Sequence, residues 1–398
     1  MKWHHVEMGK VANVVSGFGF PREFQGLTDE EFPFFKVGDM NLPGNEKFMT
    51  TISNTISGAT LKRLKAKAFP QGTIIFPKIG AAIATNKKRV LTQPSVVDNN
   101  VMGLIPKPHI TSLYLYYWML QFDLRSVSNI GPVPSMRKTE VERVSIPLPP
   151  PSEQRRIVEI LDQADALRKK RAEADDKAAR ILPALFYKMF GDPATNPKGW
   201  EQKPFDDTFA DCTAKFPKLQ RNAYHQAGKF PIVDQGKELI AGYTDDKSLV
   251  TAVEQPVIVF GDHTRIVKFV DFPFVAGADG SRVFMAKKGF SPAFLAVQLE
   301  LQPIPNLGYS RHMREVRRLH FIAPPFELQA SFAQHVMDGR QLLRSQAACS
   351  SRIDALFQGL LHRAFTGDLT AKWREAHMKQ LLVEMEAQAK SLNLRMEL

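Results

Sequence analysis

The stretch "VERVSIPLPPPSEQRRIVEILDQ", residues 141–163, changes character within a few positions. An extended apolar segment ends in three prolines, and a charged stretch with regularly spaced Ile and Leu follows at once. Because proline ends a strand and is tolerated in the first turn of a helix, Pro151 and Ser152 predict a strand followed by a capped helix. A similar passage, "VRRLHFIAPPFELQASFAQHVMD", occupies residues 316–338. The sequence therefore predicts the same strand-to-helix junction twice.

The two passages belong to a longer repeat. Residues 141–190 align with residues 316–365 without a gap, at a constant offset of 175, and nine of the fifty positions are identical. The segments ahead of each copy correspond more loosely. Each begins near a tryptophan and continues in short Val, Ile and Phe runs separated by Gly and Pro, which is typical of strands. An internal duplication explains this order.

These features predict an α+β protein with an internal repeat, in which two globular units alternate with two long helices. We expect the first globular unit at residues 1–150 and the first long helix at 151–192. The second globular unit is expected at 193–325, and the second helix with a C-terminal tail at 326–398.

Both predicted helices carry apolar residues at seven-residue spacing, which is typical of a coiled-coil seam. The first helix has Ile157, Ala164, Ala178 and Leu185 in one row and Ile160, Leu167, Ala174 and Ile181 in the other. The second has Phe332, Ile353 and Leu360 in one row and Leu342, Cys349 and Leu356 in the other. Because each helix buries only one stripe, we expect the two to pair.

Three residues disturb this seam. Arg171 and Gln346 place polar groups near its middle, either as a solvated irregularity or as a polar layer that sets the register. Pro183 lacks a backbone donor and predicts a kink or break near residue 182.

The net charge of the chain is +12, and most of it falls outside the predicted helices. Residues 1–150 carry +7 and residues 193–325 carry +3. A basic excess of this kind fits nucleic-acid binding, but it is also common in proteins that bind no nucleic acid.

Several motifs together resemble one family, the specificity subunits of bacterial Type I restriction-modification systems. They are "IPLPPPSEQRRIVEILD" with its degenerate echo "FIAPPFELQ", and "LLHRAFTGDLTAKWRE" after the second helix. Within the globular units, "FPKIGAAIATNKKRVL", "DNNVMGLIP" and "VIVFGDHTRIVKFVDFPFVAGADG" resemble target-recognition domains of that family. The resemblance covers essentially the whole chain. The second copy departs from it, because "FELQASF" has lost the "SEQRR" run.

The resemblance implies a DNA-reading subunit that is not itself an enzyme. Each of two target-recognition domains would read one half of a bipartite, asymmetric sequence in double-stranded DNA, and the long helices, as an antiparallel coiled coil, would fix the unread gap. Two adenine methyltransferase subunits would dock on the helical faces, and restriction and translocation subunits would join them. S-adenosylmethionine would bind the methyltransferase partner. The expected partner-binding residues lie in the two junctions: Pro149, Pro150, Gln154, Arg155, Pro324, Pro325 and Gln329.

Catalytic and membrane motifs are absent from the sequence, which favours a binding subunit. There is no GxxxxGK[ST] phosphate loop, no HExxH motif and no Asn/Asp-Pro-Pro-aromatic tetrapeptide resembling an adenine methyltransferase site. Cys212 and Cys349 lie too far apart in the sequence for a zinc ribbon. No apolar stretch reaches the roughly 20 residues of a membrane span, so we expect a cytoplasmic protein with no cofactor or metal of its own.

In the first globular unit, basic residues cluster in one run and one turn. Phosphate contacts need Lys and Arg, and base edges are read from rigidly held loops. The candidate DNA-binding residues are Lys62, Arg63, Asn86, Lys87, Lys88 and Arg89. A solvated basic turn, or for Lys62 and Arg63 a helical face pointing at water, explains the same pattern equally well.

In the second globular unit, "GDHTRIVK" is the most informative loop, because Arg, Asp and Thr can each contact base edges. The candidates there are Asp262, His263, Thr264, Arg265 and Lys268, with Lys215, Lys218, Arg221, Tyr224 and His225 ahead of them. Asp262 and Thr264 equally fit a role in closing the turn. Arg311, Arg314, Arg317 and Arg318 fit either phosphate contacts or internal salt bridges.

Two other classes of function compete with this interpretation. In the first, the chain is an enzyme that itself modifies or cuts DNA. In the second, it is a coiled-coil scaffold that binds only protein, and its basic surface is incidental. Salt-dependent, sequence-selective DNA binding would exclude the scaffold, because phosphate contacts impose a steep salt dependence.

Overall fold

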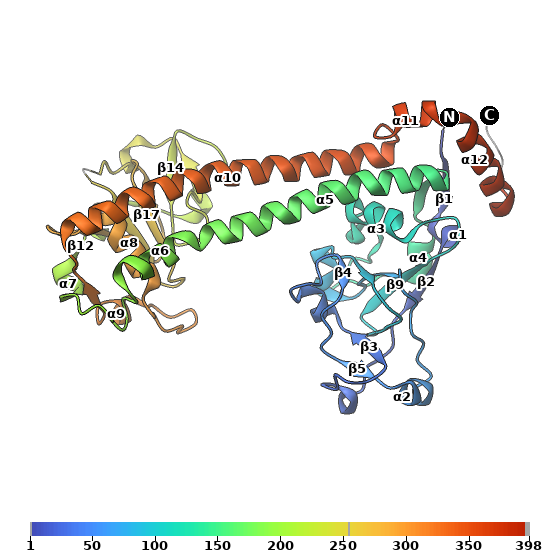
Figure 1. Cartoon of the computed structure of the whole chain (residues 1–398), viewed down its shortest axis with the longest axis horizontal. Coiled ribbons are helices and arrows are strands. Elements are labelled where there is room, and N and C mark those ends of the chain that lie inside the picture. The colour runs from blue at the N-terminus through green and yellow to red at the C-terminus, as the bar shows by residue number, and fades with distance from the viewer. Residues whose placement is uncertain (1, 254, 395–398) are drawn as a thin grey trace. The chain divides into compact units, whose positions relative to one another are not determined.

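The computed structural model describes residues 2–253 and 255–394, and the chain forms two compact units (Figure 1). Unit 1 comprises Met1–Lys169 together with Ser351–Leu398, and unit 2 comprises Lys170–Ser350. The two longest helices, α5 (Pro151–Ala179) and α10 (Phe326–Thr366), each contribute one end to each unit. Unit 1 is therefore assembled from two separate parts of the sequence.

Unit 1 contains three sheets. The largest has the order β2 (Ala12–Ser16), β9 (Val101–Pro106), β6 (Ile74–Pro77), β7 (Arg89–Leu91) and β4 (Phe48–Met49). A second has the order β5 (Thr55–Ile56), β3 (Phe32–Phe35) and β8 (Val96–Val97), and a third pairs β1 (His4–Glu7) with β10 (Ser145–Leu148). The short Val, Ile and Phe runs form these strands because alternate side chains enter the core.

The helices of unit 1 surround these sheets. They are α1 (Met8–Val11), α2 (Gly58–Arg63), α3 (Ser112–Gln121) and α4 (Lys138–Glu142), with α11 (Ala371–Ala376) and α12 (Met378–Leu392) near the C-terminus. Helix α3 is the most deeply buried of them, and its side chains share one core with Ile157 and Leu161 of α5 and Phe357 and Leu361 of α10. The long helices are thus part of the core of this unit.

Unit 2 repeats the strand pairings of unit 1. Its first sheet has the order β12 (Phe209–Asp211), β19 (Ser281–Ala286), β16 (Val257–Gly261) and β17 (Val267–Val270), all antiparallel like their counterparts β2, β9, β6 and β7. In its second sheet β14 (Phe230–Val233) pairs antiparallel with β15 (Gly242–Thr244) and parallel with β18 (Val275–Gly277), as β3 pairs with β5 and β8. The pair β11 (Gln202–Pro204) and β20 (His320–Ile322) matches β1 and β10. The α+β fold with an internal repeat is therefore confirmed.

Two strands have no counterpart in the other unit, and α2, α11 and α12 of unit 1 have none among the described residues of unit 2. Unit 1 adds β4, and unit 2 adds β13 (Lys218–Leu219) beside β18. The helices of unit 2 are α6 (Ile181–Phe190), α7 (Phe205–Thr208), α8 (Pro292–Leu301) and α9 (Met313–Val316), of which α8 takes the place of α3 in the chain order.

A buried glutamine organises each strand-to-helix junction. The Gln154 amide donates to the carbonyls of Pro149 and His109, and its oxygen accepts the N–H of Thr111, the N-cap of α3. Gln329 makes the same bonds to Pro324, Gly289 and Ser291, the N-cap of α8. Each glutamine thus ties the start of a long helix to the start of the helix beneath it. We call this arrangement the glutamine clasp.

The clasp corrects the prediction that both glutamines bind a partner protein. Gln154 and Gln329 are buried and their polar atoms are bonded within their own units. Pro149, Pro150 and Pro324 are also buried, so burial removes these residues from the candidate docking set. Arg155 and Pro325 are exposed. Ser152 is not the cap of α5, because its N–H and hydroxyl both donate to Glu384 of α12 and the helix begins at Pro151.

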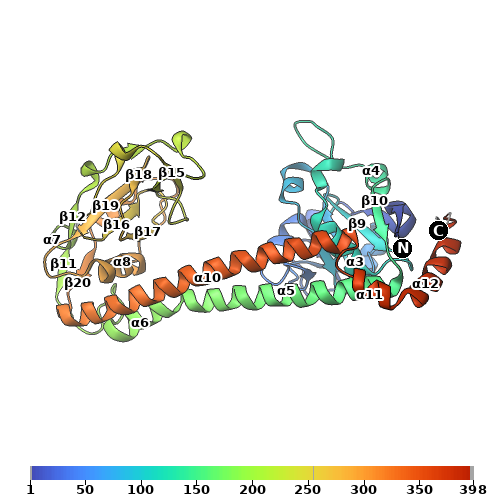
Figure 2. The ribbon, with the colours of Figure 1, turned by 90° about the horizontal axis from the view of Figure 1, so that it is seen from above.

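Within each unit the long helices pair in antiparallel fashion (Figures 1 and 2). In unit 1 the Arg168 guanidinium lies 2.8 Å from the Asp354 carboxylate, and in unit 2 the Ser350 hydroxyl donates to Asp175 at 2.6 Å. The first predicted row faces the partner helix, with Ile157, Ala178 and Phe332 buried. Arg171 and Gln346 are half-buried beside it.

The second predicted row is wrong in both helices. Leu167, Ile181, Leu342 and Leu356 are exposed, and the seam instead runs through Leu161, Arg168, Asp175 and Leu182, and through Val336, Leu343, Ser350 and Phe357. Both choices satisfy the alternation of three and four residues that a seam requires. The globular units decide between them, because Leu161, Val336 and Phe357 also fill the cores beneath the helices.

The predicted break before Pro183 is confirmed. Helix α5 ends at Ala179 and α6 begins at Ile181, with Arg180 between them. The proline ring removes a donor and clashes with the carbonyl four residues earlier, at position 179, which ends the regular ladder there.

Candidate nucleic-acid interface

Two groups of candidate residues lie in or just after the β6–β7 connection and the β16–β17 connection, which the repeat makes equivalent. In the register of the sheets, Arg89 lies opposite Ile75 in unit 1, and Lys268 lies opposite Val259 in unit 2. Ile75 in turn pairs with the third residue of β9, and Val259 pairs with the third residue of β19. The two basic residues thus occupy the same place in the two units.

Arg89 and Lys268 stabilise their own units. The Arg89 guanidinium donates to the Met40 carbonyl at 2.9 Å, and the Lys268 ammonium donates to the Asp234 carbonyl at 2.7 Å. Burial lowers the pKa of both groups, although Asp234 partly opposes this for Lys268. Each cation tethers the loop that follows β3 or β14. Lys268, which is buried, is therefore corrected from a DNA contact to a structural residue, and Arg89 is half-buried.

The turn before β7 is also folded inward. The buried Lys88 ammonium donates to the Asn86 side chain at 2.8 Å and to the Phe122 carbonyl at 2.6 Å, and burial lowers its pKa to about 7. Asn86 has a left-handed backbone and accepts the N–H of Leu124. Lys88 is thus corrected to a structural role. Lys87 is half-buried and donates to the Asn41 side chain.

The "GDHTR" turn serves mainly as a base for another loop. Asp262 is buried, and its carboxylate accepts the Met313 N–H at 2.8 Å. The Thr264 hydroxyl donates to the Gln235 carbonyl, and the Arg265 guanidinium donates to the Ile304 carbonyl at 2.9 Å. The turn-closing interpretation holds for Asp262 and Thr264, and burial removes Asp262 from the DNA-contact set.

Each turn anchors an exposed seven-residue loop that sequence analysis missed. We call residues 129–135 tip loop 1 and residues 305–311 tip loop 2. The N–H that follows tip loop 1, from Met136, donates to the Lys78 carbonyl at 3.0 Å, and the N–H that follows tip loop 2, from His312, donates to the Asp262 carbonyl at 2.8 Å. Large apolar residues next to Gly or Pro in these two segments were the available sequence signal.

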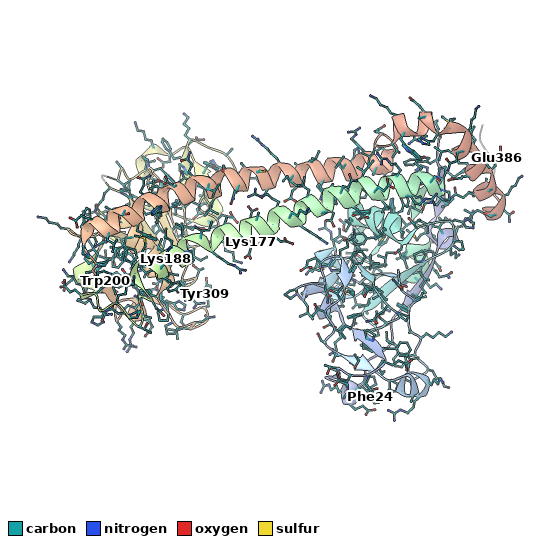
Figure 3. The ribbon with its side chains drawn as sticks, in the orientation of Figure 1. Phe24, Lys177, Lys188, Trp200, Tyr309 and Glu386 are labelled. Atoms are coloured by element: carbon teal, nitrogen blue, oxygen red, sulfur yellow. The ribbon has the colours of Figure 1, made fainter. Side chains whose placement is uncertain are left out.

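Tip loop 2 carries an aromatic pair. The Tyr309 ring stacks on His263 at 4.9 Å between centroids with an interplanar angle of 13°, and His263 Nδ1 lies 2.9 Å from the Tyr309 carbonyl oxygen. Tyr309 projects at the edge of unit 2 (Figure 3). His263 is thus the residue of the "GDHTR" turn that reaches the exposed loop.

Positive charge gathers beside tip loop 2. Burial lowers the pKa of Lys218, and the cations of Arg282 and Arg311 lower it further while Asp279 and Asp262 oppose them. Arg311 lies in the loop itself and is exposed. Lys218, Arg282 and Arg311 thus lie close enough to influence one another, and the Arg282 guanidinium also lies 3.4 Å from the Asp262 carboxylate.

The remaining candidates of unit 2 lie nearby in the chain, on the segment around β13. Lys215, Arg221 and His225 are exposed, and Tyr224 is half-buried, with burial raising its pKa to about 12. Of the four arginines before α10, Arg317 pairs with Asp206 and Asp211 and Arg318 pairs with Glu315, whereas Arg311 and Arg314 are exposed.

Lys62 and Arg63 lie on α2, at the end of unit 1 opposite α5 (Figures 1 and 3). Both are exposed, and the Arg63 guanidinium stacks 4.9 Å from the Phe24 ring and 3.6 Å from the Glu23 carboxylate. The structure does not bring this pair together with Asn86 or Lys88.

No helix among the described residues is long and apolar enough to cross a membrane. Within residues 2–253 and 255–394, no group of three or more His, Cys, Asp or Glu side chains is placed to hold a metal ion.

Comparison with known proteins identifies the class of this fold. Residues 1–174 match the Type I restriction modification DNA specificity domain family. The Type I restriction enzyme MjaIX specificity subunit of Methanocaldococcus jannaschii is 28% identical over 217 residues, which are 48% of this chain and 48% of that protein. The chain thus spans about half the length of the curated relative it matches.

Solved structures extend the likeness to nearly the whole chain. The S subunit of a Type-I restriction-modification system from M. genitalium shares the fold with a TM-score of 0.55 at 13% identity, over 91% of this chain and 96% of that one. A chain from a structure of complex assembly and conformational transition in the type I R-M system gives 0.51 at 16% identity, over 92% and 98%. The predicted resemblance to Type I specificity subunits is therefore confirmed.

Proposed function

We propose that this chain is the specificity subunit of a Type I restriction-modification complex and that it reads a bipartite, asymmetric sequence in double-stranded DNA. The observation that carries the proposal is the repeated strand order of the two units, each of which presents an anchored loop at the same place. Two equivalent but non-identical readers suit a target with two different halves. The subunit acts in the cytoplasm and is not catalytic.

In this proposal residues 1–150 and 193–325 are the two target-recognition domains. The contacts to DNA come from the candidates that are not buried: Lys62, Arg63, Asn86, Lys87, Arg89, Lys215, Lys218, Arg221, Tyr224, His225, His263, Thr264 and Arg265. Lysines and arginines bind phosphates and position the duplex, and specificity comes from base edges.

The paired helices, expected at residues 151–192 and 326–398, set the unread gap. Helix α10 has 41 residues, which gives roughly 60 Å at 1.5 Å per residue. Half-sites one turn of B-DNA apart are about 34 to 36 Å apart. A helix of this length is thus sufficient to separate two readers by more than one turn.

The partners in this proposal are two adenine methyltransferase subunits and the restriction and translocation subunits. The methyltransferases carry the S-adenosylmethionine. Arg155 and Pro325 are exposed at the two strand-to-helix junctions, which supports docking of the methyltransferases there.

A long-read map of adenine methylation in the host, with the gene intact and deleted, tests the proposal. Loss of methylation at one bipartite motif on deletion would support it and would give both half-sites and the gap. The proposal would be overturned if the chain, assembled with its methyltransferase, showed no sequence-selective binding to DNA at any salt concentration.

A further inference from the structure

The two most exposed large apolar side chains in the described part of the chain lie in the two tip loops. Tyr309 is 85% exposed, and Ile130 is fully exposed at 105% of its reference area. Val133 in tip loop 1 and Leu307 in tip loop 2 are exposed as well. Single exposed apolar residues are ordinary. Here, however, the equivalent loop of each repeat carries one of the two apolar side chains with the highest exposed fraction, which chance scatter does not explain.

Hydrogen bonds close each loop at its base. In tip loop 1 the Asn129 side chain accepts the Ser135 N–H at 2.6 Å, and Gly80 N–H donates to the Pro134 carbonyl at 2.7 Å. In tip loop 2 the buried His312 accepts the Leu307 N–H at 3.1 Å through Nε2, and its Nδ1 lies 2.8 Å from the Asp262 carbonyl oxygen. Each loop is closed at its base, so its apolar residues project from a rigid support.

The surroundings of both loops favour a polyanion. Exposed Arg137 lies two residues after tip loop 1, and exposed Arg311 lies in tip loop 2, where its charge reaches Lys218. An apolar protein partner would not require this charge, whereas duplex DNA supplies phosphates for the cations and stacked bases for the apolar tips. Apolar side chains inserted between base steps unstack them, at a cost of a few kcal/mol per step that surrounding contacts offset.

We propose that each tip loop inserts its apolar tip, Ile130 with Val133 in unit 1 and Tyr309 with Leu307 in unit 2, against a base step of its half-site and unstacks that step. This inference rests on the proposed function. His263 positions the Tyr309 ring by stacking on it, and Arg311 holds the adjacent phosphate.

The test uses the full chain assembled with its methyltransferase partner, and the cognate duplex from the methylation map with 2-aminopurine placed at each position in turn. The fluorescence of this base rises when it unstacks. We expect a rise of several-fold at one step in each half-site. Flipping of the target adenine by the methyltransferase raises fluorescence at that base and serves as an internal reference.

Variants assign the two signals. Tyr309→Ala should remove the rise in the half-site read by unit 2 only, Tyr309→Phe should keep it, and Ile130→Gly should remove the rise in the other half-site only. Ile240→Ala and Leu27→Ala, which truncate exposed apolar residues elsewhere in units 2 and 1, are matched controls and should change neither signal.

The outcomes separate this inference from the proposed function. Sequence-selective, salt-dependent binding without any rise outside the target adenine would overturn the inference alone. Rises that persist in Tyr309→Ala and Ile130→Gly would also overturn it. Absence of sequence-selective binding by the assembled complex would overturn the proposed function and the inference together.

Discussion

The two units share a strand order but attach their long helices differently. In unit 1 the space between α3 and the helices is filled by Tyr117, whose hydroxyl donates to Asp162 at 2.5 Å and accepts from the Lys47 ammonium at 2.8 Å. In unit 2 the aligned position of α8, counted from the N-caps Thr111 and Ser291, is Val297. There Val297 lines a cavity of about 330 Å³ together with Leu182, Val336, Leu343, Glu300 and Arg340, among others.

This difference shows which features the fold requires. Both units keep the glutamine clasp and the tethering cation, Arg89 or Lys268, so these contacts are the shared framework. The filling beneath the helices is free to vary, from an aromatic ring beside a half-exposed ion pair in unit 1 to an open pocket in unit 2.

The largest effect is expected from giving unit 1 the residue of unit 2. Tyr117→Val should destabilise unit 1 by about 3 to 4 kcal/mol, because it opens a cavity and removes the hydroxyl that bonds to both Lys47 and Asp162. Hydrogen exchange of α3 and α8 amides measures each unit separately. Equal loss of protection in both helices would contradict the assignment to unit 1.

The clasps offer a second comparison, with a smaller difference. Gln329→Ala should cost about 3 kcal/mol, since it leaves the Ser291 N–H and two carbonyls unpaired. Gln154→Ala should cost about 1 kcal/mol less, because Gln388 of α12 also donates to the Pro149 and His109 carbonyls. Chemical unfolding monitored by hydrogen exchange gives both values, and Gln388→Ala combined with Gln154→Ala should remove the difference.

The reverse exchange tests the cavity. Val297→Tyr should stabilise unit 2 by about 1 kcal/mol by burying apolar area in the open space, while Val297→Ala should destabilise it. The thermal midpoint of the α8 region reports the change. A lower midpoint for Val297→Tyr would mean that the space does not accept the ring.

The last effect concerns the pH dependence of stability. Burial lowers the pKa of Lys88 to about 7, so between pH 7 and about 10 the unfolded chain binds a proton that the folded unit has released. The stability of unit 1 should therefore rise across this window. Urea titrations of wild type and Lys88→Met should show that the variant lacks the rise. An equal rise in both would contradict it.

The sequence predicted those features that depend on local pattern. The repeated Pro-Pro junction, the break before Pro183 and the strand-rich units follow from backbone rules that act over a few residues. The second row of the seam was mispredicted, because two stripes satisfied the same spacing and only the core beneath, through Leu161 and Phe357, chooses between them.

The candidate interface was predicted at the correct turns but partly with the wrong residues. Lys88, Lys268 and Asp262 have side chains suited to DNA, and the sequence does not show that backbone carbonyls and N–H groups distant in the chain bind them instead. The tip loops were not predicted, because their apolar residues fit a buried position in the sequence but are exposed in the structure. An exposed Ile or Tyr is indistinguishable from a core residue until its burial is known.

The discontinuity of unit 1 has a consequence for synthesis on the ribosome. The buried Glu153 carboxylate binds Thr370 and Arg374 on one side and Trp3 on the other, and the core of unit 1 includes Phe357 and Leu361. Chains elongate from the N-terminus, and domains fold as units once their residues have emerged. Unit 2, which is continuous from Lys170 to Ser350, is therefore complete before unit 1 is. Unit 1 is therefore synthesised first but completes its folding last. Until the end of α10 has been synthesised, Ile157 and Leu161 lack the helix that covers them in the folded protein.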